Sequence, residues 1–138
     1  MRRSGWAVPL FAFLVLILPS FSTLQDSGII LHSGSEDDPW EYIHSLDSGA
    51  DDHGYGIAVD SSGNTYVTGS FSGENITFGA TTLTNTLVGT SDVFIAKLSE
   101  SGLWSWALSA GGISNDWGAD LTVATTGEIY VTGAFTTT

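Results

Sequence analysis

An internal repeat at an offset of 64 residues constrains the fold of this chain more than any other feature. Residues 40–71 align without a gap on residues 104–135, and eleven of the 32 positions are identical. Four identities are consecutive, the Tyr-Val-Thr-Gly of residues 66–69 and 130–133. Self-similarity at such a period is typical of solenoids, propellers and other repeat arrays.

Each copy consists of short strand candidates joined by tight turns. The expected strands are residues 57–59, 65–71, 76–78, 81–84, 93–98 and 104–110. Gly63 is placed to supply a positive φ in the first turn. Residues 93–98 have the pattern of a buried central strand, whereas Trp104 and Trp106 are expected to share one face of the strand 104–110. With 17 glycines, and no sustained helical period after residue 25, the sequence predicts an all-β fold.

A unit of this size corresponds to about one blade of a β-propeller with its connections. The predicted architecture is therefore β-propeller-type repeats, about one and a half blades of an incomplete propeller, with the second repeat truncated. Propellers need about four to eight blades to close. We expect the 138 residues to be a fragment of a larger folded unit; the alternative is that several chains assemble to close the ring.

The N-terminus has the three-part pattern of a secretory signal peptide. Arg2 and Arg3 precede an apolar run at residues 7–18, and cleavage is expected after Ser22. The run is shorter than the roughly 20 residues needed to span a bilayer, although an uncleaved anchor is an alternative. The predicted organisation is a signal peptide at 1–22, an acidic linker at 23–39 and propeller repeats at 40–138. The expected location is secreted or cell-surface.

The exported part of the chain is strongly acidic and contains no cysteine. Beyond residue 22 the sequence contains fifteen acidic residues and one Lys or Arg residue, Lys97. The formal net charge of this part is therefore 1 − 15 = −14. This balance excludes nucleic acid and anionic lipid as partners, because both are bound through clustered Lys and Arg. It favours solubility in a salty medium, with divalent cation binding as the alternative. Stacked repeats can supply the stability that disulfides give many small secreted domains.

These segments resemble the SBBP-type β-propeller repeat of bacteria and archaea. The matching stretches are residues 52–69, the Asp-Val-Phe-Ile-Ala-Lys-Leu of residues 92–98, and residues 106–112 with their paired glycines. The second copy departs from the family pattern at Ala124 and Glu128, where the first copy has Asp60 and Asn64. The resemblance implies a secreted or surface-exposed propeller, often one module of a large extracellular protein, without defined catalytic residues.

The residues offer little for catalysis. The three histidines, His32, His44 and His53, are interpreted as loop and rim residues, since no nucleophile motif accompanies them. Paired carboxylates such as Asp51 and Asp52 are the remaining candidates for hydrolysis. We predict no enzymatic activity.

Asp52 and Asp116 occupy the same repeat position, each two residues before a glycine. They are weak Ca²⁺ candidates, because Ca²⁺ prefers carboxylate and carbonyl oxygens in glycine-bearing loops. The favoured interpretation is structural: each Asp accepts backbone N–H bonds in an Asx turn. No other cofactor is expected.

The weak ligand-binding candidates are Trp117 and Tyr55, which lie next to glycines and could stack on sugar rings. Asn75 begins an Asn-Ile-Thr glycosylation sequon in an expected surface hairpin. The predicted function is a non-catalytic extracellular module for binding or display at the cell surface, with an unknown protein or glycan as partner. The alternative is the non-catalytic part of a larger secreted hydrolase or carbohydrate-active protein.

Overall fold

The computed structural model describes residues 29–33 and 42–136, and every regular element in these ranges is a β-strand. The all-β prediction is therefore confirmed. The expected signal peptide lies outside the described residues. Within the described ranges, no helix has the length and apolar character that crossing a membrane requires.

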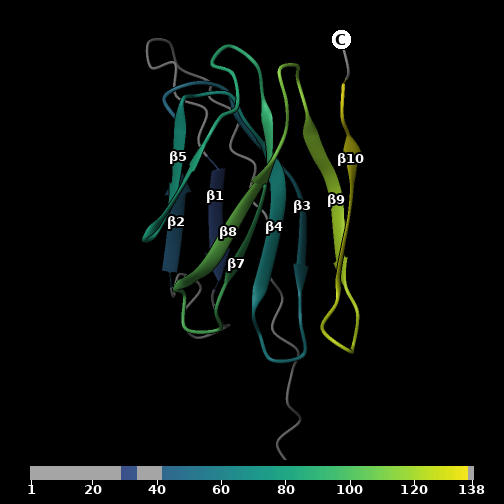
Figure 1. Cartoon of the computed structure of the whole chain (residues 1–138). Helices are drawn as coiled ribbons and strands as arrows, with labels where there is room; N and C mark the ends of the chain where they lie inside the picture. The colour runs from purple at the N-terminus through teal and green to yellow at the C-terminus, as the bar shows by residue number, and fades with distance from the viewer. Residues whose placement is uncertain (1–28, 34–41, 137–138) are drawn as a thin grey trace, which may run out of the picture.

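A four-stranded antiparallel sheet forms the centre of the molecule (Figure 1). Its strands are β3 (Asp52–Val59), β4 (Thr65–Phe71), β7 (Asp92–Leu98) and β8 (Trp104–Ala110), in that order. The chain adds each strand beside the previous one, so β3 and β8 are the edges. Between β4 and β7 a separate hairpin is inserted, made of β5 (Asn75–Phe78) and β6 (Thr81–Thr84).

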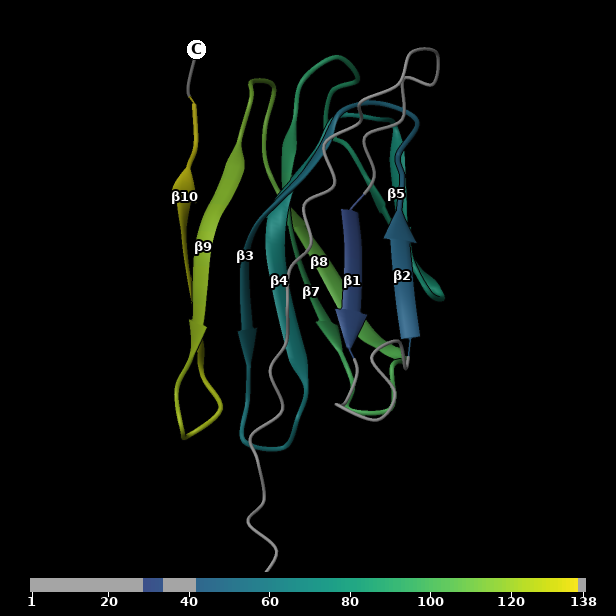
Figure 2. The same ribbon diagram turned by 180° about the vertical axis from the view of Figure 1, so that it is seen from behind.

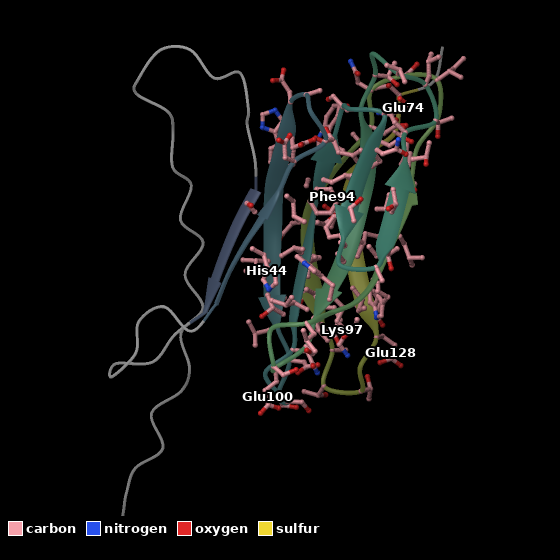
Figure 3. The ribbon with its side chains drawn as sticks, turned by 90° about the vertical axis from the view of Figure 1, so that its left-hand side faces the viewer. His44, Glu74, Phe94, Lys97, Glu100 and Glu128 are labelled. Carbon is pink, nitrogen blue, oxygen red and sulfur yellow. The ribbon has the colours of Figure 1, made fainter. Side chains whose placement is uncertain are left out.

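Three turns of one design close the strand pairs at one end of the molecule, which we call the turn end. In each turn the first residue exchanges backbone hydrogen bonds with residues three and four positions later: Asp60 with Gly63 and Asn64, Ser99 with Gly102 and Leu103, and Ala124 with Gly127 and Glu128. The glycine has a positive φ each time, 81° in the case of Gly63, as the sequence predicts. Figure 3 shows Glu100 and Glu128 at this end and Glu74 at the opposite, loop end.

Further strand pairs flank the central sheet (Figure 2). The hairpin of β9 (Trp117–Val123) and β10 (Ile129–Ala134) lies against β3, β4 and β7. The pair β1 (Ile29–Ser33) and β2 (Tyr42–Leu46) lies on the side of the sheet away from this hairpin, together with β5 and β6. The predicted linker at residues 23–39 therefore contains a strand, β1.

The main core lies between the central sheet and the strands on the side of β2, β5 and β6. Phe94 of β7 is fully buried there, and the Phe78 ring packs on it with ring centroids 5.4 Å apart. Trp104 meets Phe78 edge-on at 5.0 Å. Leu46, Val67, Phe71, Ile76, Leu83, Ala96 and Ala107 complete this core. Strand β7 is buried along most of both faces, which confirms it as a central strand.

The expectation that Trp104 and Trp106 share a face of β8 is wrong. The register of β7 and β8 shifts between Lys97 and Leu98, because Lys97 pairs with Trp106 and Leu98 with Trp104. The extra residue in β8 reverses the alternation of side chains at this point. Trp104 therefore reaches the core, whereas the Trp106 ring packs on Tyr66, whose ring also lies 5.2 Å from the Lys97 ammonium.

Candidate functional site

The loop end is organised around a buried aspartate at the start of β3. Asp52 is 3 % exposed and accepts hydrogen bonds from the backbone N–H and the hydroxyl of Ser48, at 2.7 and 2.6 Å. The same hydroxyl oxygen accepts a bond from the Gly73 N–H at 2.9 Å. Burial raises the pKa of the Asp52 carboxyl, although the bonds from Ser48 and from the Ser72 backbone lower it in part. Asp52 thus connects two loops across the hairpin.

Asp116 repeats this arrangement 64 residues later. It is also buried, and its Oδ1 accepts a bond from the Thr136 N–H at 2.7 Å, as Asp52 does from the equivalent Ser72. The position equivalent to Ser48 is Gly112, so the second copy lacks the hydroxyl. The two aspartates do one task twice, but the glycines that follow, Gly54 and Gly118, lie inside strands rather than in the expected Asx turns.

A third buried aspartate, Asp92, was not found by sequence reasoning. Its Oδ2 accepts bonds from the backbone N–H and hydroxyl of Thr86, both at 2.8 Å. Its Oδ1 is buried and accepts no hydrogen bond from the described residues. Gly111 leaves the space for this carboxylate, since a Cβ there would lie 2.1 Å from Oδ1. In the sequence, this site corresponds to an Asp at the start of the strand segment 92–98 together with two consecutive glycines at residues 111 and 112.

These carboxylates do not form a metal centre in the described part of the chain. No group of three or more acidic, histidine or cysteine side chains that could hold a metal ion occurs there. Ca²⁺ normally takes six to eight oxygen ligands, and Asp52 and Asp116 use carboxylate oxygens to accept bonds from neighbouring loops.

The three histidines lie within strands of the structure. His44 lies in β2 and His53 in β3, within strands rather than in the expected loops. The Nε2 of His44 is 2.8 Å from the carbonyl oxygen of Gly102, and its ring packs edge-on against Trp104. These contacts hold β2 against the start of β8. His32 lies in β1.

A β-bulge in β3 determines the direction of Tyr55. Gly54 pairs with Gly69 and Gly56 pairs with Thr68, so Tyr55 has no partner on β4. Bulges re-aim side chains and are common next to functional sites. The Tyr55 ring is 49 % exposed and stacks on the His53 ring, with centroids 5.7 Å apart.

The same bulge recurs in β9, where Gly118 and Asp120 pair with β10 and Ala119 has no partner. The bulge therefore forms with alanine as well as with tyrosine, and the ring of Tyr55 is not needed for the backbone geometry. A residue that the fold does not require is a candidate for binding.

Trp117 lies in β9 at the repeat position of His53, and its side chain is 40 % exposed. Strands β3 and β9 lie side by side in Figures 1 and 2. We call the exposed rings of His53, Tyr55 and Trp117 on these two strands the aromatic edge. Both ligand candidates from the sequence belong to it.

The sequon residue Asn75 is exposed at the first position of β5. Its Oδ1 accepts a bond from the Thr84 hydroxyl at 2.8 Å on the same outward face. The hairpin β5–β6, which contains the sequon, is thus regular. Thr77 and Thr82 form the next exposed pair on the same face as Asn75 and Thr84.

The arrangement of strands defines a class of protein. A four-stranded antiparallel meander, with the first two strands of an equivalent sheet packed on its face, is the stacking of neighbouring β-propeller blades.

The comparison with known families agrees with this class. Residues 47–76, which include β3 and β4, match the SBBP family, described as a beta-propeller repeat. Residues 47–76 therefore form an SBBP-type β-propeller repeat, and the all-β fold is consistent with an open, incomplete propeller. No curated protein matches the chain.

Proposed function

We propose that this chain is a non-catalytic propeller module that acts outside the cell and binds a surface glycan through the aromatic edge. The observation that carries the proposal is the bulge at Tyr55, which leaves a half-exposed ring at a position where the second copy has Ala119. Aromatic rings combine a flat apolar face with polar surroundings, which suits stacking on the C–H faces of sugars.

The negative charge of the chain indicates which kind of glycan it can bind. The exported part has fifteen acids and one Lys, so anionic polysaccharides would be repelled at low ionic strength. A neutral sugar polymer avoids this cost. The N-terminal signal pattern and the sequon at Asn75 support an extracellular location.

The test uses an array of neutral and anionic glycans, with Tyr55→Ala and Trp117→Ala compared with the unmodified chain. We expect binding to neutral glycans and a loss of tenfold or more in both variants. Tyr55→Ala should fold, since alanine already occupies the equivalent bulge position in β9, and Trp117→Ala should fold because Trp117 is 40 % exposed. Leu103→Ala is the matched control, because Leu103 is 68 % exposed but lies at the turn end. Equal binding by all four proteins, or binding to proteins alone, would refute the glycan proposal.

A further inference from the structure

The strand pair β1–β2 has the register of the pair β7–β8. In the first pair Ile29 faces Leu46 and Ser33 faces Tyr42. Adding 64 to each number gives Val93 opposite Ala110 and Lys97 opposite Trp106, which are the observed partners in β7–β8. The three pairs between these ends agree in the same way. The pair β1–β2 is therefore the outer half of a blade that precedes the complete one.

The sequence between the two strands supports the same alignment. Ser35, Glu36 and Trp40 are identical to Ser99, Glu100 and Trp104. The repeat thus extends from residues 40–71 back to residue 29. The described residues therefore comprise an outer half-blade, one complete blade, and the inner half-blade β9–β10.

The inner half-blade exposes residues that are buried in the complete blade. Phe71 is fully buried and its equivalent Phe135 is 63 % exposed; Tyr66 is 4 % exposed and its equivalent Tyr130 is 60 % exposed. The residues are identical, so the difference lies in their surroundings. In the complete blade β7 pairs with β4, whereas in the described residues β10 pairs with β9 alone.

We propose that β10 of one copy of this chain pairs with β1 of a second copy, which completes a four-stranded blade β9–β10–β1–β2 from two chains. The register follows from the pairing of β4 with β7, in which Thr68 faces Ile95 and Tyr66 faces Lys97. Adding 64 to the residue numbers of β4 and subtracting 64 from those of β7 gives the register of the new pair. In it, Thr132 faces Leu31 of the second copy, and Tyr130 faces its Ser33. The occupant is a second copy because this chain itself contains a strand pair with the required register.

A contact of this kind can close into a ring. A head-to-tail contact uses two different surfaces, so it produces rings when the rotation closes. Each copy contributes strands equivalent to two blades, and propellers have about four to eight. Rings built from these strands alone would therefore contain two, three or four copies. Added salt should promote assembly, because it screens the repulsion between acidic chains. This inference is independent of glycan binding.

The first test measures the mass of the full chain by light scattering over a wide concentration range. We expect a concentration-dependent shift from one copy to a defined assembly of two, three or four. Phe135→Asp should abolish the shift, because it places a charge where Phe71 is buried in the complete blade. Leu103→Asp, a change at an equally exposed turn-end position, should not affect it. A single copy at all concentrations would refute the proposal, and the blade would then be completed by other segments.

The second test fixes the register with disulfides, since the chain contains no cysteine of its own. Residues directly opposite in an antiparallel pair have Cβ atoms about 4.5–5.5 Å apart. A mixture of Thr132→Cys chains and Leu31→Cys chains should form a crosslinked pair under mild oxidation. Thr132→Cys with His32→Cys, one residue out of register, should crosslink at least tenfold more slowly. Equal rates, or self-crosslinking of Thr132→Cys alone, would contradict the proposed pairing.

Discussion

Gly118 of β9 lies directly over Thr68 of β4, and a Cβ on Gly118 would be 2.1 Å from the Thr68 Oγ1. Both residues are buried, and the Thr68 hydroxyl is held by a 2.8 Å bond to the carbonyl oxygen of Phe94. The absence of a side chain at residue 118 therefore lets the β9–β10 hairpin pack against the central sheet.

We expect Gly118→Ala to destabilise the protein by about 1–3 kcal/mol, the usual cost of adding a methyl group to a close-packed contact. Urea unfolding followed by tryptophan fluorescence would measure it, with Trp117 next to the site. Gly112→Ala is the control, because the nearest atom to a Cβ at Gly112 is 3.9 Å away. Equal midpoints for the two variants would contradict the close contact.

The two equivalent phenylalanines offer a matched pair of substitutions. Phe71→Ala should cost about 3–5 kcal/mol, because it removes a fully buried ring and leaves a cavity. Phe135→Ala should change the free energy of unfolding by less than about 0.5 kcal/mol in dilute solution, as expected for an exposed position. Thermal unfolding at low protein concentration would compare them. Similar losses would mean that Phe135 is buried in the single chain.

The first turn can be transferred to the second repeat. Asp60 accepts bonds from the backbone N–H groups of Ser62 and Asn64, the Asn64 side chain and the Tyr66 hydroxyl. The second turn has Ala124 and Glu128 instead, although Tyr130 is retained.

The double change Ala124→Asp with Glu128→Asn should therefore stabilise the β9–β10 hairpin by about 0.5–1.5 kcal/mol, the net contribution of a hydrogen bond. Hydrogen exchange of the β10 amides would report this gain. Each single change should give less than the pair does. A double variant with unchanged protection of the β10 amides would contradict the expected gain in the β9–β10 hairpin.

Asp60 should also make stability depend on acidity. Burial raises the pKa of Asp60, but the bonds from Asn64, Ser62 and Tyr66 outweigh it, so the pKa lies below its usual value. A carboxyl with a lowered pKa in the folded state stabilises the protein above its unfolded pKa of about 3.9, and this contribution is lost as the pH falls through the folded pKa.

In Asp60→Asn the loss of melting temperature between pH 5 and strongly acidic solution should be smaller than in the unmodified protein. Burial raises the pKa of Asp52, so its effect on stability has the opposite sign. Its contribution to the stability of the folded state is present at low pH and is lost as the pH rises through the folded pKa. Asp51→Asn serves as an exposed control. An unchanged acid slope in Asp60→Asn would rule out its role.

Local patterns in the sequence predicted much of this fold. Gly63 and Gly102 mark turns because their positive φ is accessible to glycine, and the apolar run at residues 93–98 marks a buried strand. The exposed candidates Tyr55 and Trp117 could be identified from their place beside glycines.

Other features depend on pairing between distant segments, which one sequence does not reveal. The bulge opposite Leu98 reverses Trp104 and Trp106, and only the partner strand determines where the extra residue lies. Strand β1 was not predicted from the sequence because it shares no identical residue with β7. Only the structure shows that the pair β1–β2 has the register of the pair β7–β8. Asp92 needs both the strand end and Gly111, nineteen positions away, to be recognised as buried.

The two faces of the hairpin β5–β6 have different surroundings. Ile76, Phe78 and Leu83 face the core and are buried, while the alternate positions face outwards with Asn75, Thr77, Thr82 and Thr84. A backbone bond of 2.9 Å from the Asn85 N–H to the Glu74 carbonyl closes its base, and this bond does not involve the outward side chains. Substitutions in that outward row should therefore cost little folding free energy, so the hairpin is a suitable place to graft a foreign peptide epitope.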